Sequence, residues 1–137
     1  MKIVICGSMT LAQKMLEAER ELQTRGHKVI LPEFVREYAV LENAEERHTE
    51  SAKNKIQYDL IRQYYHQIAE SDAVLVVNHE RHGISNYIGG NSFLEMGFAH
   101  VLRRGIYLLN PIPEMLYTDE IKAMQPIVIN EDYDLIE

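Results

Sequence analysis

The 137-residue sequence has a single cysteine, no run of basic residues and no long hydrophobic segment. One cysteine cannot form an internal disulfide, so Cys6 fits a reducing compartment, and its position at the end of an apolar run indicates a buried structural thiol. A net charge of −7 without a basic stripe argues against a nucleic-acid polymer as the main partner. No signal peptide or membrane span is recognisable, and the expected location is therefore the cytoplasm.

The composition is that of a folded domain. Hydrophobic residues make up 46% of the chain, which is enough for a real core in one domain spanning residues 1–137. Charged residues make up 26%, a balance that argues against global disorder. The sequence contains no internal repeat, linker or low-complexity segment, so we expect a single domain.

Apolar runs alternate with segments of helical periodicity along most of the chain. Strands are expected at residues 3–6, 27–31, 72–77, 106–109 and 126–129, and helices at residues 11–25, 52–70, 91–104 and 115–124. This alternation predicts an α/β fold: a Rossmann-like three-layer α/β/α domain with a mostly parallel five-stranded sheet. The dinucleotide fingerprint G-x-G-x-x-G is missing after the first strand, which argues against a standard NAD enzyme.

A glycine pair, Gly89 and Gly90, lies between the expected third strand and the helix that follows it, and Asn91 and Ser92 come next. Ligands of open α/β sheets bind at the carboxyl ends of strands, and the free N–H groups of a helix start favour an anion or a polarised oxygen. Glu95 falls in the first or second turn of this helix, close to any such ligand. Alternatively, Ser92-x-x-Glu95 is a capping box that only closes the helix.

Two further strand ends are candidate contact points. Residues 7–10, with Gly7, Ser8 and Met9, form the turn after the first strand, which is either a ligand loop or a plain tight turn. Thr10 with Gln13 three residues later resembles a capping signature for the helix that follows. Asn110 comes at the end of the expected fourth strand and is the third candidate contact.

Three other features have competing interpretations. The charged segment 34–51 is either a solvated helix or loop, or a lid that brings Arg36 or Arg47 to an anionic substrate. His79-x-x-His82 lacks a third ligand at suitable spacing, so no metal site is predicted. The helix at 52–70 has an apolar, tyrosine-rich face that must pack on the sheet or on another subunit.

Together, three stretches resemble the nucleoside 2-deoxyribosyltransferase-like proteins, a superfamily that includes the 2′-deoxynucleoside 5′-monophosphate N-hydrolases. They are Ile-Cys-Gly-Ser at residues 5–8, Glu-Ser-Asp-Ala-Val-Leu-Val-Val-Asn at 70–78, and Asn-Tyr-Ile-Gly-Gly-Asn-Ser-Phe-Leu-Glu-Met-Gly-Phe-Ala at 86–99. The resemblance runs from Lys2 to about Pro113. It implies a Rossmann-like fold, a homodimer or higher homo-oligomer, and chemistry at a nucleoside N-glycosidic bond. No cofactor is expected.

The resemblance also assigns roles to individual residues. Glu95 matches the family's nucleophilic glutamate, residues 7–8 match its first substrate-binding loop, and residues 89–92 match the loop that holds the sugar or its phosphate. Family enzymes carry an aspartate about eight residues before the aspartate that opens the third strand. Counting back from Asp72 gives Tyr64, and the nearest carboxylate is Asp59, so either is a candidate second catalytic group.

The expected function is hydrolysis or transfer at the N-glycosidic bond of a (deoxy)nucleoside or its 5′-monophosphate, with Glu95 as the nucleophile. The alternative is a catalytically inactive module of the same fold that binds or senses a nucleoside or nucleotide. The missing aspartate favours the second hypothesis, and the retained glutamate favours the first. The sequence leaves open the preference for base and sugar, the need for a phosphate, and the choice between hydrolysis and transfer.

Overall fold

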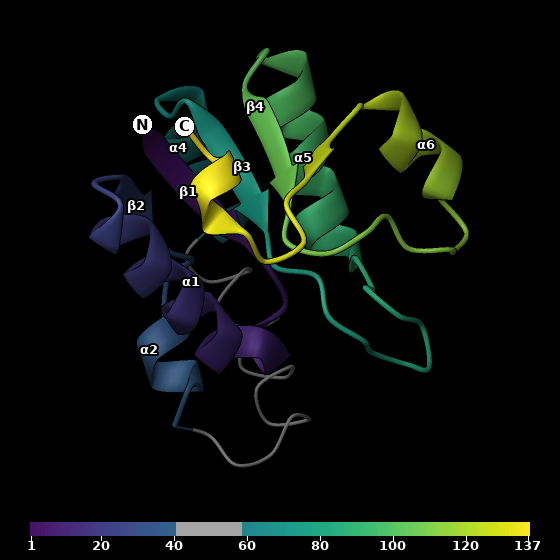
Figure 1. Ribbon diagram of the computed structural model, residues 1–137, viewed down its shortest axis with the longest axis horizontal. Coiled ribbons are helices and arrows are strands. Elements are labelled where there is room, and N and C mark those ends of the chain that lie inside the picture. The colour runs from purple at the N-terminus through teal and green to yellow at the C-terminus, as the bar shows by residue number, and fades with distance from the viewer. Residues whose placement is uncertain (41–58) are drawn as a thin grey trace.

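The computed structural model describes residues 1–40 and 59–137, and its centre is a five-stranded sheet (Figure 1). The strands are β1 (Lys2–Cys6), β2 (Lys28–Ile30), β3 (Ala73–Val76), β4 (Gly105–Leu108) and β5 (Ile127–Val128). Their order is β2-β1-β3-β4-β5, and every neighbouring pair is parallel. The Rossmann-like three-layer fold predicted from the sequence is therefore confirmed, with a sheet that is wholly rather than mostly parallel.

Helices cover both faces of this sheet (Figure 1). They are α1 (Ala12–Thr24), α2 (Val35–Tyr38), α4 (Leu60–Ala69), α5 (Gly90–Val101) and α6 (Thr118–Ala123), with 3₁₀ turns at Met9–Leu11 and Tyr133–Leu135. α1, α2 and the last turn share one hydrophobic cluster with the sheet, and α4, α5 and α6 share the other. None of the described helices is long and apolar enough to cross a membrane.

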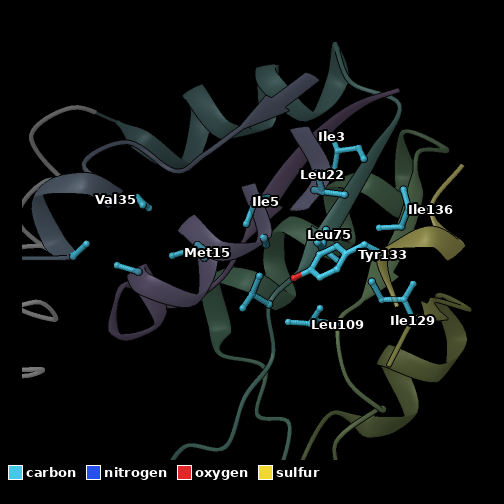
Figure 2. Close-up of a cluster of buried hydrophobic side chains, with 14 of the residues drawn as sticks. Ile3, Ile5, Met15, Leu22, Val35, Leu75, Leu109, Ile129, Tyr133 and Ile136 are labelled. Carbon is cyan, nitrogen blue, oxygen red and sulfur yellow. The ribbon is translucent and has the colours of Figure 1, made fainter. Parts of the chain in front are cut away.

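Alternate residues of the strands face opposite helical layers, because successive strand side chains point to opposite sides of a sheet. Ile3, Ile5 and Leu75 pack in the α1 layer together with Met15 and Leu22, and Figure 2 shows this cluster. The alternate strand residues, such as Val4, Cys6 and Val74, pack in the opposite layer, under α4 and α5. Both faces are buried, which explains why the central strands are continuous apolar runs.

The chain order creates a topological switch point between β1 and β3. β2 lies on one side of β1, whereas β3, β4 and β5 follow on the other, so the loops after β1 and β3 diverge at the same edge of the sheet. Ligands of open α/β folds bind in the crevice that opens at such a point. The sheet topology therefore places the expected ligand crevice at residues 7–11 and 77–89.

Local expectations outside the sheet met with mixed outcomes. Thr10 is not the cap of α1: Ser8 accepts the Thr10 N–H at 3.3 Å and caps the 3₁₀ turn that precedes the helix. The expected helix at 52–70 is present from Leu60 to Ala69, and its residues 52–58 lie outside the described part of the chain. Arg36 pairs with the Glu19 carboxylate at 2.9 Å rather than facing a ligand, and Arg47 lies outside the described residues.

Candidate functional site

The N-terminus of α5 has free backbone donors. Gly89 is the N-cap and Gly90 the first helical residue, and no side chain caps this end. The first intrahelical bond runs from the Phe93 N–H to the Gly89 carbonyl at 2.9 Å, so the preceding N–H groups have no helical acceptor. Ser92 is already inside the first turn, and the capping-box interpretation of Ser92 and Glu95 is therefore wrong.

A tyrosine from the segment before α6 fixes the approach to this helix. The Tyr117 hydroxyl donates a hydrogen bond to the Ile88 carbonyl, and the Tyr117 ring stacks on Phe93 with centroids 4.3 Å apart. Ile88 is fully enclosed, with 1% of its surface exposed. The backbone leading into Gly89 is consequently held from both sides before any ligand arrives.

The turn after β1 forms the opposite wall. Gly7 follows the buried Cys6, and a Cβ atom at this position would lie 3.0 Å from Met15 Sδ and 3.5 Å from the Val77 carbonyl. Only glycine avoids this crowding, so the chain passes close to α1 and β3 before it turns. Ser8 then holds the turn through its hydroxyl, which lies 3.0 Å from the Thr10 hydroxyl.

These two walls and part of the loop after β3 enclose a space that we call the loop cavity. It is lined by Gly7, Ser8, Met9, Thr10, Pro32, Arg81, His82, Tyr87, Gly89, Gly90, Asn91, Ser92 and Glu95. Backbone groups, hydroxyls and a guanidinium predominate in this lining. The loop cavity is therefore suited to a polar ligand with several hydrogen-bond acceptors.

A second space, the interhelix cavity, lies between α4 and α5. It is lined by Pro32, Glu33, Leu60, Ile61, Gln63, Tyr64, Gln67, Asn91, Leu94, Glu95 and Phe98. Aliphatic and aromatic side chains supply much of this lining, with carboxamides among them, which suits a flat, largely apolar group. Glu95, Asn91 and Pro32 line both cavities, so the Glu95 carboxylate stands where the two spaces meet.

Two buried side chains, Cys6 and Tyr64, lie near Glu95. The Cys6 thiol makes a hydrogen bond with the Glu95 carboxylate, and burial, followed by the negative charge of Glu95, raises the pKa of Cys6 well above its usual value. Burial and the nearby Cys6 and Glu95 likewise raise the pKa of Tyr64, whose hydroxyl donates to the Ile5 carbonyl. Cys6 is fully buried, as expected, and serves Glu95 as a neutral donor rather than as a thiolate nucleophile.

Most of the site residues predicted from the sequence come together. Residues 7–9 and 89–92 line the loop cavity with Glu95, and Tyr64 joins Glu95 in the interhelix cavity. Asp59 lines neither cavity, and its carboxylate pairs with Arg62 on the exposed side of α4. Asn110 also lies outside both linings, because its side-chain amide donates to the Asn78 carbonyl at 2.8 Å.

Sequence reasoning missed several lining residues, and two of them, Arg81 and Glu33, are charged. Arg81 lies within the His79-x-x-His82 segment, which was assessed only as a metal site, yet it lines the loop cavity. Glu33 follows β2 and lines the interhelix cavity together with Glu95. Pro32, which ends the second strand, was the available signal for Glu33, since it marks the carboxyl end of a strand beside the switch point.

The two histidines of His79-x-x-His82 have different surroundings. His82 lines the loop cavity, with its ring 5.3 Å from that of Tyr87. Burial and then the nearby Lys14 lower the pKa of His79, which indicates a position on the α1 side of the loop. The described residues contain no group of three His, Cys, Asp or Glu side chains that could hold a metal ion.

Comparisons with known proteins agree with this architecture. No protein-family model matches the sequence, and neither does any curated protein. Among solved structures, the chain is similar to a 2-deoxyribosyltransferase from the psychrotolerant bacterium Bacillus psychrosaccharolyticus, with a TM-score of 0.52 and 18% sequence identity. The match covers 93% of this chain and 98% of the other. The protein therefore has a nucleoside 2-deoxyribosyltransferase-like fold.

Proposed function

We propose that the protein cleaves the N-glycosidic bond of a (deoxy)nucleoside or its 5′-monophosphate, with Glu95 as the nucleophile. The observation that carries this proposal is the position of the Glu95 carboxylate at the junction of the loop cavity and the interhelix cavity. The name of the structural neighbour, a 2-deoxyribosyltransferase, agrees with this chemistry.

The two linings suggest how the substrate is oriented. The sugar lies in the loop cavity, against the glycine-rich turn at residues 7–9 and the start of α5 at residues 89–92. The base lies in the interhelix cavity, where Leu94 and Phe98 present apolar surface to a planar ring. The anomeric carbon, which joins sugar to base, then lies beside Glu95.

The chemistry requires a carboxylate at this junction. Departure of the base develops positive charge on the anomeric carbon, which a carboxylate can stabilise or trap as a covalent glycosyl intermediate. The departing base takes up a proton, and water or a second base then attacks the same carbon and frees Glu95. Attack by water makes the enzyme a hydrolase, and attack by a base makes it a deoxyribosyltransferase.

Three side chains are candidates for the proton donor to the base. Asp59 is engaged with Arg62 outside both cavities, and the Tyr64 hydroxyl is engaged with the Ile5 carbonyl. Glu33 lines the cavity in which we place the base and is exposed, so it can exchange protons with solvent. We therefore favour Glu33 over Asp59 and Tyr64 for this role.

A chromatographic assay for free base tests the proposal. Glu95→Gln keeps the size of the side chain but removes the nucleophile, and we expect base release to fall by at least about 1,000-fold. Glu33→Gln should lower it by about 100-fold, as is typical for the loss of a general acid. Glu70→Gln, an exposed residue at the end of α4 that lines neither cavity, is the matched control. Full turnover by Glu95→Gln would refute the nucleophile assignment.

The engaged states of Asp59 and Tyr64 favour one alternative, a module that binds a nucleoside or nucleotide without cleaving it. Such a module would be stabilised against heat by its ligand but release no base, with or without an acceptor base. Glu95→Gln would then bind the ligand as well as the wild type or better, because a negative charge is lost. Base release that depends on Glu95 would exclude this alternative.

A further inference from the structure

Arg81 lies in a small hairpin that fixes its backbone. The Arg81 N–H donates to the Ile84 carbonyl at 3.1 Å, and the Ile84 N–H donates back at 2.9 Å. His82 and Gly83 between them have φ angles of 54° and 74°, the left-handed pair that a two-residue type I′ turn requires. The Glu80 carboxylate accepts the Gly83 N–H at 3.1 Å and tightens the turn. Arg81 is thus positioned before any ligand binds.

The side chain of Arg81 differs from those of the ion-paired arginines. Arg25, Arg36 and Arg62 each pair with a carboxylate, whereas Arg81 Nη1 donates to the Ser8 hydroxyl at 2.9 Å and makes no ion pair within the described residues. It is also half-buried in the wall of the loop cavity. A partly desolvated guanidinium without a counterion is costly, and most of its N–H donors stay available to an anion.

The surroundings of Arg81 also favour an anionic ligand. The free N–H groups at Gly90 and Asn91, at the positive end of the α5 dipole, line the same cavity. Among the described residues, Glu95 is the one carboxylate in this lining. Glu95 lies five residues into the helix after Gly90, a rise of roughly 7.5 Å. A pentose spans a similar length, so a group on the side of the sugar away from the anomeric carbon would lie near the start of α5.

We propose that Arg81, held on Ser8, is a specificity-determining residue that selects a substrate with a phosphate on its 5′ carbon over the unphosphorylated nucleoside. This inference rests on the proposed function for its orientation of the sugar. A planar guanidinium matches two phosphate oxygens at once, and the α5 N–H groups contact the remaining oxygen. The 5′-monophosphate is accordingly the substrate class, and the nucleoside is a poor substrate.

Kinetics with paired substrates test this assignment. The 2′-deoxynucleoside 5′-monophosphates and the matching nucleosides are compared in the wild type, Arg81→Gln and Arg81→Lys. We expect Arg81→Gln to lower kcat/KM for the monophosphates by about 10- to 100-fold, the usual range for a hydrogen bond to a charged group. Its kcat/KM for the nucleosides should stay within about twofold, and Arg81→Lys should lie between because it keeps charge but not the planar fork.

Arg20→Gln is the matched control, because it changes the net charge equally at an exposed position on α1. Equal kcat/KM for nucleosides and monophosphates, or an equal loss for both in Arg81→Gln, would overturn the assignment and leave the proposed function standing.

If no protein, wild type included, releases base, the proposed function fails and melting temperatures decide the assignment. Greater protection of the wild type by a monophosphate than by its nucleoside, lost in Arg81→Gln but not in Arg20→Gln, supports it. Equal protection refutes it.

Discussion

The two cavities beside Glu95 differ in what forms their walls. The loop cavity is formed largely by backbone at strand ends and at the start of α5, with Arg81 and hydroxyls added. The interhelix cavity is formed by side chains of α4 and α5, such as Leu60, Leu94 and Phe98. One helix thus supplies polar donors from its first turn and apolar surface from its second and third.

This difference separates two tasks. Backbone N–H groups are fixed by the fold and recognise oxygen atoms, whereas a wall of side chains can change with the sequence and leave the fold intact. The loop cavity is therefore suited to the part of the substrate that stays constant, and the interhelix cavity to the base. Substitutions that affect one cavity but not the other break or sharpen this division.

Among the substitutions that test this division, the largest effect is expected from a charge in the interhelix cavity. Leu94 is 42% exposed, so Leu94→Asp should leave the fold intact but place a carboxylate where the base is bound. Because a desolvated charge beside an apolar ring is costly, we expect kcat/KM to fall by about 100-fold for every base. Val101→Asp, at an 80% exposed position of the same helix, is the control. If both variants keep wild-type kcat/KM, the base is not bound between α4 and α5.

A smaller effect, on the pH dependence of folding stability, is expected at Cys6, the buried residue beside Glu95. Its thiol stays protonated in the folded protein above pH 9.0, where the unfolded chain loses that proton. The contribution of Cys6 to folding stability should thus be constant below about pH 9 and fall by about 1.4 kcal/mol for each further pH unit. Denaturant unfolding of the wild type and Cys6→Ser at pH 7 to 10.5 measures this slope.

Cys6→Ser has no titrating group at this position, so its decline should begin about one pH unit later. There Tyr64, Tyr117 and Tyr133 take over, because each has an ordinary value of 10.0 and a raised pKa in the folded protein. Parallel profiles for the two proteins would contradict a buried, protonated Cys6. Because serine keeps a hydrogen-bond donor for Glu95, base release at pH 7 should change less in Cys6→Ser than in Cys6→Ala.

The sequence predicted the loop cavity better than the interhelix cavity, and the reason is physical. Gly7, Gly89 and Gly90 follow strands directly, and parallel strands must bring their ends together, so local patterns determine most of this cavity. The interhelix cavity depends on how α4 packs against α5, which periodicity alone does not specify. Glu33 was missed for this reason, since it enters that cavity from the end of β2.

The remaining differences between prediction and structure arise where a side chain has more than one possible hydrogen-bond partner. Asn110 lies at a strand end, as predicted, but the neighbouring loop offers Asn78, and the two amides bind each other's backbone instead of a ligand. Ser92 and Glu95 have capping-box spacing, yet α5 begins at Gly90 because the anchored Ile88 fixes where the helix starts. Residue spacing predicts what is possible, and tertiary contacts select among the possibilities.

The smallest effect compares two glycines of α5. Neither Gly90 nor Gly97 has an atom within 4 Å of a Cβ added to it, so alanine fits at both positions. Gly97→Ala should raise the free energy of unfolding by about 0.5–1 kcal/mol, because glycine is unfavourable inside a helix, and Gly90→Ala by less, at the helix start. Only Gly90 lines the loop cavity, so Gly90→Ala alone should weaken the binding of a 5′-monophosphate, by a few-fold. Calorimetric titration of both variants measures this. Equal affinities would mean that the start of α5 does not contact the phosphate.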